Sequence, residues 1–327
     1  MKKNIALVTG GFSGEAVISY KSAVTIDNNL DRDRFNVFKI DVNPKGWFYE
    51  LADGRKAEID KNDFTLPIDN HRVVFDAVFI GMHGTPGEDG KLQGYFDTLK
   101  IPYTSCDAAT SAITFNKRYT VAVAKMAGIA VANSIHLFKH TPIPAAQLLN
   151  QLKLPVFVKP NNGGSSIGMS KVDQPGDLES AIVKAFNEDD QVLVEEMVNG
   201  REFTVGVFKT KDNIIVLPLT EVKAHGDKAF FDFEAKYQGK STETTPAEVE
   251  EAIADKVRQA AKRIYEVFNC RGVVRIDFIY NDETGNPYML EINTIPGQSE
   301  ASIVPQQVKA MGWSLKEFYS KLVEEIL

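Results

Sequence analysis

Two carboxylates and an amide fall within a segment that has the pattern of a β-hairpin. Residues 273–280 and 288–297 are rich in apolar and β-branched residues, and the Asn-Asp-Glu-Thr-Gly-Asn stretch between them is typical of a turn. Asp277 interrupts the first strand, and Glu291 and Asn293, two residues apart, share one face of the second. A register with Asp277 opposite Glu291 would gather these oxygen ligands on one face.

This ligand set indicates a metal. Carboxylates held so close repel each other, so we expect a cation between them. A set without Cys or His suits Mg²⁺ better than Zn²⁺, and Mg²⁺ held by few carboxylates usually completes its shell with water and phosphate oxygens. The segment alone leaves a second interpretation equally open, in which Arg275 and Asp277 are ordinary surface charges on a two-sided hairpin.

A glycine- and serine-rich loop, residues 163–168, is expected between two short strands, and Lys159 ends the first. Glycines let backbone N–H groups converge on an anion without clashes from Cβ atoms. The loop is compatible with a lid over nucleotide phosphates, although it is not the Walker pattern, and an ordinary hairpin is the simpler interpretation. Glu195, Glu196 and Glu202 flank the next expected hairpin, where they could hold a ribose or simply line a solvated edge.

Further candidates surround the first hairpin. Arg275 precedes Asp277 by two residues on the same strand face, and Gly297 follows the second strand, so a guanidinium and a backbone N–H are available for a developing oxyanion. His83 follows a strand end but has no obvious partner, and a lone histidine is more often structural. No Ser/His/Asp triad is recognisable. Residues 221–246 form a long aromatic segment of the kind that is usually functional.

Composition excludes several classes of protein. The chain has 327 residues, a net charge of −7 and two cysteines far apart. The absence of a Lys/Arg run argues against nucleic-acid binding, and the cysteines form neither a disulfide framework nor a metal cluster. The apolar residues 5–8 are too short for a signal sequence, and no window approaches a membrane span. We expect a soluble cytoplasmic protein.

The elements that would position these residues alternate between strands and helices. A buried strand, a glycine turn and a helix open the chain without the three-glycine dinucleotide fingerprint, which predicts a doubly wound α/β unit. We expect strands at 5–9, 35–40, 73–81, 155–159 and 169–172, a hairpin of 191–198 with 201–208, a strand at 213–219, and helices at 15–30, 91–99, 108–127, 177–186, 246–268 and 314–327.

Taken together, these segments resemble the D-alanine–D-alanine ligases of the ATP-grasp superfamily. The likeness covers nearly the whole chain and rests on motifs in the family's order at residues 10–15, 83–90, 164–170, 233–237, 275–277 and 291–297. The resemblance implies an α/β ATP-grasp fold of three α/β domains, the first with a doubly wound parallel sheet. Their expected bounds are 1–104 (substrate-binding), 105–194 (central ATP-grasp) and 195–327 (C-terminal ATP-grasp, with metal site and lid).

The resemblance also implies roles for individual residues. Those implied to bind ATP are Lys117, Lys159, Ser166, Glu195, Glu196, Glu202 and Lys236. Asp277, Glu291 and Asn293 would hold two Mg²⁺ or Mn²⁺ ions, with Glu291 bridging. Those implied to act on the substrates are Glu15 with Ser165 and Tyr237 at the ammonium of the first D-alanine, Arg275 and Gly297 at the oxyanion, and His83, Ser302 and Ile303 as further substrate contacts.

The implied reaction joins two D-alanines for peptidoglycan precursors through an acyl phosphate, with residues 221–246 as the lid that excludes water. This sequence departs from the family at Val17, Ile295 and the run 298–301, which concerns the acceptor more than ATP. Tyr237 favours a D-alanine over a D-lactate acceptor. Alternatives are a related carboxylate–amine ligase with another acceptor, or a non-catalytic ATP-binding protein. The family is commonly homodimeric; we expect small-molecule substrates and neither nucleic-acid nor membrane partners.

Overall fold

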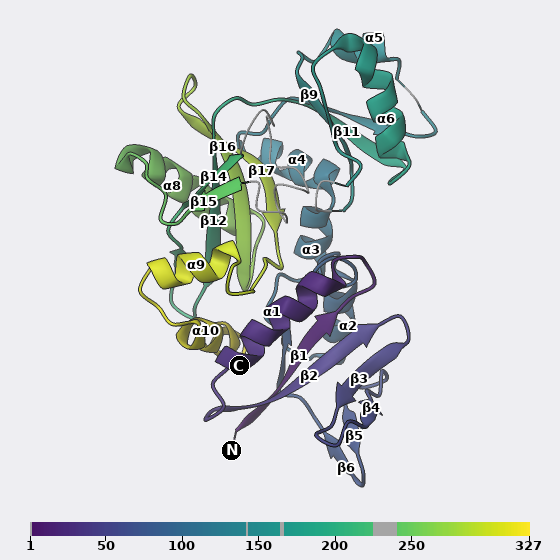
Figure 1. Cartoon of the computed structure of the whole chain (residues 1–327), viewed down its shortest axis with the longest axis vertical. Coiled ribbons are helices and arrows are strands. Elements are labelled where there is room, and N and C mark those ends of the chain that lie inside the picture. Colours follow the sequence, from purple (N-terminus) through teal and green to yellow (C-terminus); the bar gives the residue numbers. More distant parts are fainter. Residues whose placement is uncertain (1, 142, 164–166, 225–240) are drawn as a thin grey trace.

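The N-terminal lobe is built on a mixed five-stranded sheet in the order β4-β3-β2-β1-β7. The computed structural model describes residues 2–141, 143–163, 167–224 and 241–327 (Figure 1). Strands β2, β1 and β7 are parallel, as expected for a doubly wound unit, whereas β3 and β4 add antiparallel edges. The lobe comprises β1 (Lys3–Gly10), α1 (Ala16–Asn29), β2 (Phe35–Asn43), β3 (Gly46–Glu50), β4 (Lys56–Glu58), the hairpin β5 (Leu66–Ile68) and β6 (His71–Val73), β7 (Ala77–Ile80) and α2 (Lys91–Leu99).

Two helices rather than one connect this lobe to the rest of the chain. The expected helix at 108–127 is divided into α3 (Ala108–Phe115) and α4 (Lys117–Met126). Asn116 between them has extended backbone angles, φ −98° and ψ 106°, and its side chain accepts a hydrogen bond from the backbone N–H of Tyr119 at 3.2 Å. Asparagine is a favoured N-cap, so this residue ends one helix and begins the next.

The middle lobe is an antiparallel sheet in the order β10-β9-β11-β8 with helices on one side. Its elements are β8 (Ser134–Phe138), α5 (Ala145–Leu149), β9 (Val156–Pro160), β10 (Ser170–Val172), the short helix η1 (Pro175–Asp177), α6 (Leu178–Phe186) and β11 (Gln191–Glu196). Alternate residues of the strands, such as Val156 and Val158, are buried against Leu148 and Leu178 of the helices. Strand β8 was not among the sequence expectations.

The C-terminal lobe holds the largest sheet, in the order β15-β14-β12-β16-β17, with β13 beside β12. Its elements are β12 (Arg201–Lys209), β13 (Ile214–Val216), β14 (Thr220–Ala224), β15 (Ser241–Thr244), α8 (Glu251–Val267), β16 (Val273–Asn281), β17 (Asn286–Asn293), α9 (Ile303–Ala310) and α10 (Leu315–Ile326). Glu221 on β14 is buried, and burial by itself raises the pKa of its carboxyl group. Hydrogen bonds from Arg201 and Lys223 lower this pKa by more, so the net shift of the pKa is downward.

The expected hairpin of 191–198 with 201–208 is wrong. Strand β11 pairs with β8 and β9 in the middle lobe, whereas β12 pairs with β16 in the C-terminal lobe. The turn signal at Gly200 has another cause: a Cβ atom there would lie 2.0 Å from the carbonyl oxygen of Tyr280. The glycine therefore lets the chain pass close to β16 as it crosses from one sheet to the other.

One apolar core joins the two ends of the chain. Side chains of β1 and α1, including Ile5 and Ile26, belong to the same buried cluster as Phe318 and Leu322 of α10. Figure 1 shows the C-terminus beside the N-terminal lobe. The N-terminal and C-terminal lobes are thus held together by packing. No helix within the described residues is long and apolar enough to cross a membrane.

Candidate active site

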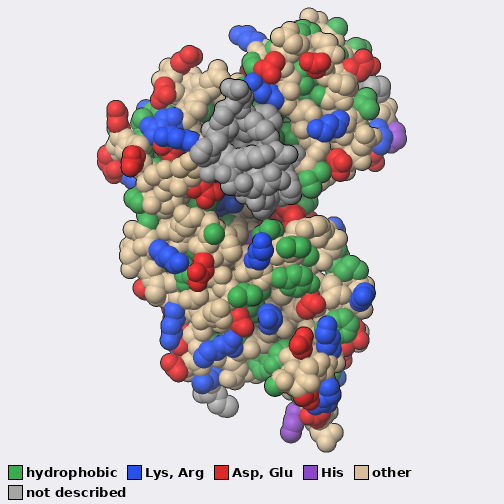
Figure 2. Space-filling model, viewed as in Figure 1, with side chains coloured by type: hydrophobic (Ala, Val, Ile, Leu, Met, Phe, Trp, Pro, Cys, Tyr) green, Lys and Arg blue, Asp and Glu red, His purple; other side chains and the backbone are tan. Residues whose placement is uncertain are grey.

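A cavity of about 380 Å³ lies where the three lobes meet, and we refer to it as the central cleft. Its lining comes from α1, the loop after β7, helices α3 and α4, strands β9, β11, β12 and β14–β17, and the loop 294–302 with the start of α9. The volume is within the usual range for a small-molecule site. On the face shown in Figure 2, basic and acidic side chains are interspersed.

The expected register of the hairpin is confirmed. Asp277 on β16 lies opposite Glu291 on β17, and Arg275 lies opposite Asn293. All four residues line the central cleft. The carboxylate of Asp277 accepts hydrogen bonds from Arg275 Nε at 2.9 Å and from its terminal nitrogen at 2.8 Å. The same guanidinium lies 3.8 Å from a Glu291 oxygen, so a positive charge stands between the two carboxylates.

These residues fit a hard cation. Asp277, Glu291 and Asn293 offer only oxygen ligands, which is the chemistry of Mg²⁺ and Mn²⁺. Asp277 is also held by the hydroxyl of Thr204, its cross-strand neighbour on β12, and the Asn293 side-chain oxygen accepts from the Ile295 N–H at 3.0 Å. Among the described residues there is no group of three or more His, Cys, Asp and Glu that could form a separate metal centre.

Two lysines reach the central cleft from the opposite side. Lys159 at the end of β9 pairs with Glu195 on β11 at 2.8 Å, and both side chains are largely buried. Lys117, the first residue of α4, donates to the carbonyl of Gly163 at 2.7 Å. Glu202 lines the cleft as well. Lys117 therefore contacts Gly163, the first residue of the loop for which a phosphate lid is one interpretation.

Glu196 differs from its neighbour Glu195. Successive side chains of a strand point to opposite faces, and only Glu195 lines the central cleft. The carboxylate of Glu196 accepts from the N–H of Lys153 at 2.8 Å and from the side chain of Asn133 at 3.0 Å. Its side chain thus has a structural partner outside the cleft lining.

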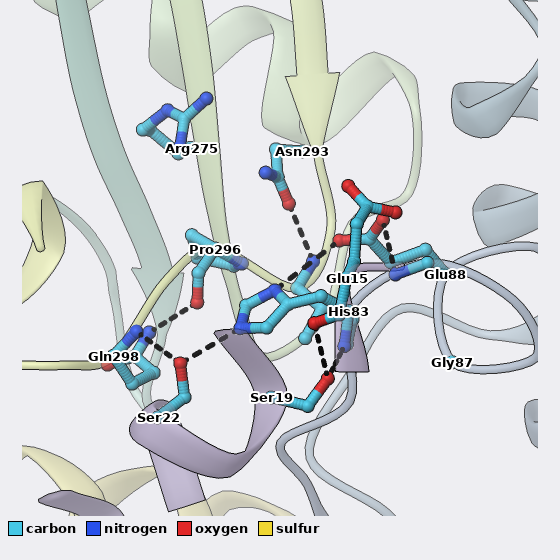
Figure 3. A network of polar contacts seen from close by, with 12 residues as sticks. Glu15, Ser19, Ser22, His83, Gly87, Glu88, Arg275, Asn293, Pro296 and Gln298 are labelled. Atoms are coloured by element: carbon cyan, nitrogen blue, oxygen red, sulfur yellow. Dashed lines mark hydrogen bonds and ion pairs between the residues drawn. The ribbon is translucent and has the colours of Figure 1, made fainter. Parts of the chain in front are cut away.

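The view that His83 has no partner is wrong. Its Nε2 lies 2.9 Å from the hydroxyl of Ser22, and its backbone N–H donates to Ser19 at 2.9 Å, both on α1 (Figure 3). Its Nδ1 lies 3.8 Å from a Glu88 carboxylate oxygen. His83, Glu15 and Glu88 all line the central cleft. Ser22 is 61 residues away from His83 in sequence, so no local pattern reveals the contact.

The loop after β17 brings Gly297, Ser302 and Ile303 into the central cleft. A Cβ atom on Gly297 would lie 2.8 Å from the Ser302 hydroxyl, so this approach needs a small residue. The departures at Ile295 and Gln298 fall elsewhere: both side chains are buried outside the cleft lining, and Ile295 belongs to the apolar core of the N-terminal lobe.

Several polar residues of the lining were not singled out from the sequence, among them Thr204, Glu88 and Glu243. Thr204 could have been found, because it follows Glu202 by two residues and so shares its strand face. Glu88 lies within the motif 83–90 but was given no role. No sequence pattern points to Glu243 on β15. Burial raises the pKa of its carboxyl group, and the charge of Arg275 and a hydrogen bond from Gln306 offset part of this rise. Four expected site residues lie outside the described residues: Ser165, Ser166, Lys236 and Tyr237.

Comparison with known proteins gives a consistent family. Residues 4–106 match the model of the D-ala D-ala ligase N-terminus, and residues 122–325 match that of the D-ala D-ala ligase C-terminus. The D-alanine--D-alanine ligase of Flavobacterium johnsoniae is 44% identical over 322 residues, which is 98% of each chain. That of Parabacteroides distasonis is 43% identical over 327 residues, 100% of this chain and 98% of the relative.

Solved structures agree over the full length. The VanG D-Ala:D-Ser ligase from Enterococcus faecalis has a TM-score of 0.90 and 29% identity and covers 100% of both chains. The D-alanyl-alanine synthetase A from Vibrio cholerae has a TM-score of 0.88 and 30% identity, with 99% of this chain and 98% of that chain covered. A Bacillus anthracis D-alanine--D-alanine ligase complexed with ATP has a TM-score of 0.76 and 26% identity, with 99% and 96% covered. The α/β ATP-grasp fold expected from the sequence is confirmed, and the chain belongs to the D-ala D-ala ligase family.

Proposed function

We propose that this chain joins two molecules of D-alanine in an ATP-dependent reaction that supplies D-alanyl-D-alanine for peptidoglycan precursors. One observation carries the proposal: the acidic hairpin with Arg275 and the buried Lys159–Glu195 pair line the same cleft from opposite sides. Such a cleft can hold a nucleotide triphosphate and a carboxylate substrate together. Relatives with this activity in their names match the chain over nearly its whole length.

ATP would bind between the middle and C-terminal lobes. We assign its phosphates to Lys117 and Lys159, its adenine to the strand end at Glu195 and its ribose to Glu202. The two lysines would neutralise charge on the transferring phosphoryl group. Ser166 and Lys236 would complete this part of the site, and Glu196 would contribute through its backbone, because its side chain is bonded to Lys153 and Asn133.

Asp277, Glu291 and Asn293 are the residues that would hold two Mg²⁺ or Mn²⁺ ions. The metal supplies charge neutralisation for the phosphates and orients them. Asp277 Oδ2 accepts one hydrogen bond from Arg275 and keeps a lone pair with which it could bind the cation. The guanidinium, held beside Asp277, would face the reacting carboxyl group.

The substrates would occupy the side of the cleft that faces the N-terminal lobe. Glu15, with Ser165 and Tyr237, would anchor the ammonium of the first D-alanine, and His83 would lie beside it. A carboxylate is a poor acyl donor, so its oxygen first attacks the γ-phosphorus of ATP, which releases ADP and leaves an acyl phosphate. The amine of the second D-alanine, held by Ser302 and Ile303, then attacks the acyl carbon. Arg275 and the Gly297 N–H would stabilise the tetrahedral oxyanion, which collapses with loss of phosphate.

The test is phosphate release from ATP with D-alanine as the only other substrate, with the product identified by its mass. D-alanyl-D-alanine is the expected product. Because one structural neighbour is a D-Ala:D-Ser ligase, D-serine and D-lactate are added in competition. If the product with D-serine or D-lactate formed in preference to D-alanyl-D-alanine, the assignment of D-alanine as the acceptor would be contradicted. ATP binding without turnover would leave only a nucleotide-binding protein.

We further propose that the chain forms a homodimer and acts in the cytoplasm, where ATP and a reducing environment for the free Cys106 and Cys270 are available. Val17, Tyr20 and Val24 form an exposed stripe on one face of α1, with 60%, 42% and 54% of their surface accessible. Sedimentation velocity should give a dimer for the wild type and a monomer for Val24→Glu. A monomeric wild type would contradict the homodimer.

A further inference from the structure

Gln298 lies in the loop 294–302, beside the glycine that we assign to the oxyanion. It is 4% exposed, and its contacts reach three parts of the fold. Its side-chain Nε2 donates to the carbonyl of Pro296 at 3.1 Å, and its Oε1 accepts from the hydroxyl of Tyr319 on α10 at 3.2 Å. Its backbone N–H donates to the hydroxyl of Ser22 on α1 at 3.1 Å (Figure 3).

The orientation of the Gln298 amide follows from its partners. The Pro296 carbonyl can only accept a hydrogen bond, so the amide nitrogen has to face it. The amide oxygen is then left for the Tyr319 hydroxyl, which donates. Both partners are buried, and a methionine at this position would have no strong donor or acceptor with which to replace either contact.

The carbonyl of Pro296 and the N–H of Gly297 belong to one peptide group. No cis bond occurs between these two residues, so the group is planar and trans, and its C=O and N–H point in opposite directions. Holding the carbonyl toward the buried Gln298 side chain therefore directs the N–H away from the protein interior. The next peptide is fixed as well, because the Gln298 N–H is bound to Ser22.

We propose that Gln298 is a positioning residue, which turns the Gly297 N–H into the central cleft by holding the Pro296 carbonyl. The inference rests on the proposed function, because it takes the Gly297 N–H as an oxyanion donor. Ser22 also contacts His83 at 2.9 Å, so the same residues connect the donor to the substrate-binding side of the N-terminal lobe. A backbone donor is otherwise free to rotate with its loop, and this network removes that freedom.

The test compares Gln298→Met, Gln298→Glu and Tyr319→Phe with the wild type. Gln298→Met keeps the side-chain volume and removes both hydrogen bonds. Loss of an oxyanion donor lowers kcat by about 10²–10³-fold, so we expect its misorientation to lower kcat for dipeptide formation by about 10- to 100-fold, with KM for ATP within about twofold. Gln298→Glu places a carboxylate oxygen against the Pro296 carbonyl and should be at least as impaired, whereas Tyr319→Phe leaves the Pro296 contact and should be milder.

Gln306→Met is the matched control, because the Gln306 side chain holds the Ala301 carbonyl of the same loop at 2.8 Å without touching the Pro296–Gly297 peptide. Because Gln306 also hydrogen-bonds Glu243 of the cleft lining, the kcat of Gln306→Met is a comparison value and should fall less than that of Gln298→Met. The amide resonance of Gly297 in ¹⁵N-labelled full-length protein gives a readout independent of turnover and should move in Gln298→Glu and Gln298→Met only. Wild-type kcat and an unmoved Gly297 resonance in a folded Gln298 variant would overturn the proposal.

If Gln298→Met does not fold, the same comparison is made between Gln298→Glu and Tyr319→Phe. Equal loss of kcat in the two would also overturn the proposal, because Tyr319→Phe retains the Pro296 contact. If the wild type does not join D-alanine at all, the proposed function fails, and the Gly297 resonance alone decides whether Gln298 orients this peptide.

Discussion

Replacing Glu291 with glutamine should abolish most turnover and leave the protein folded. The side chain is 40% exposed, and its oxygen lies 3.8 Å from Arg275, beyond hydrogen-bond distance. An ion pair with this exposure contributes at most about 1 kcal/mol to stability. Loss of this ion pair by itself should change the melting temperature by no more than about 3 °C.

The effect on the reaction should be far larger. A ligand that helps neutralise charge in phosphoryl transfer is worth several kcal/mol. A loss of about 4 kcal/mol corresponds to roughly a 10³-fold lower rate of phosphate release. The Mg²⁺ concentration for half-maximal rate should also rise, by about tenfold or more, because a neutral amide oxygen replaces a carboxylate.

The assay is D-alanine-dependent phosphate release over a Mg²⁺ titration, together with thermal unfolding. Glu283→Gln is the matched control, since it makes the same change at an exposed position in the turn of the same hairpin. Wild-type turnover with an unchanged Mg²⁺ dependence in Glu291→Gln would refute the metal assignment. A loss of activity accompanied by unfolding would refute the stability argument.

Further substitutions test the surrounding charges. Asp277→Asn should destabilise the chain by about 1–3 kcal/mol in urea unfolding, because this buried residue accepts two hydrogen bonds from Arg275 and an amide can satisfy only one of them; an unchanged stability would contradict the pairing. Lys159→Met should weaken ATP binding at least about tenfold in calorimetry, because it removes a charge opposite the phosphates, and wild-type affinity would exclude Lys159 from the phosphate site. The pKa of Glu221 is lower in the folded chain than its ordinary value of 4.5. The ionised carboxylate therefore stabilises the fold fully at pH values above 4.5. This stabilisation is lost as the pH falls through the folded-state pKa. Glu221→Gln should therefore be less stable than the wild type at neutral pH, and urea unfolding from pH 7 to pH 3 should show this difference shrinking with acidity.

The hairpin of the acidic residues could be predicted because its determinants are local. Alternation of polar and apolar residues fixes which side chains share a face, and the turn fixes which residues lie opposite. Asp277 and Glu291 are paired in the structure as the sequence indicates. Helix α2 could also be predicted from its own segment, and its observed bounds are the expected ones, Lys91–Leu99.

Where pairing depends on distant segments, the sequence was misleading. Strand β11 takes β8 as a partner, more than fifty residues upstream, and the adjacent β12 takes β16 instead. Nothing in residues 191–208 distinguishes these partners from each other. The division at Asn116 was a different kind of error, because its capping signal is local and was overlooked. Ser22 contacts His83 within the N-terminal lobe and Gln298 from the C-terminal lobe, and both partners are distant in sequence, so only the folded chain reveals these contacts. The domain limits at 104/105 and 194/195 stay predictions.

The cluster that joins α10 to β1 and α1 has a consequence for synthesis of the protein. Ile5 of β1 and Ile26 of α1 share a buried cluster with Phe318 and Leu322, which leave the ribosome about three hundred residues later. At roughly 5–20 residues per second, that cluster stays incomplete for about 15 to 60 s. The cluster begun by β1 and α1 is thus completed by α10, and a chain interrupted before α10 would expose these apolar side chains to aggregation and to chaperones.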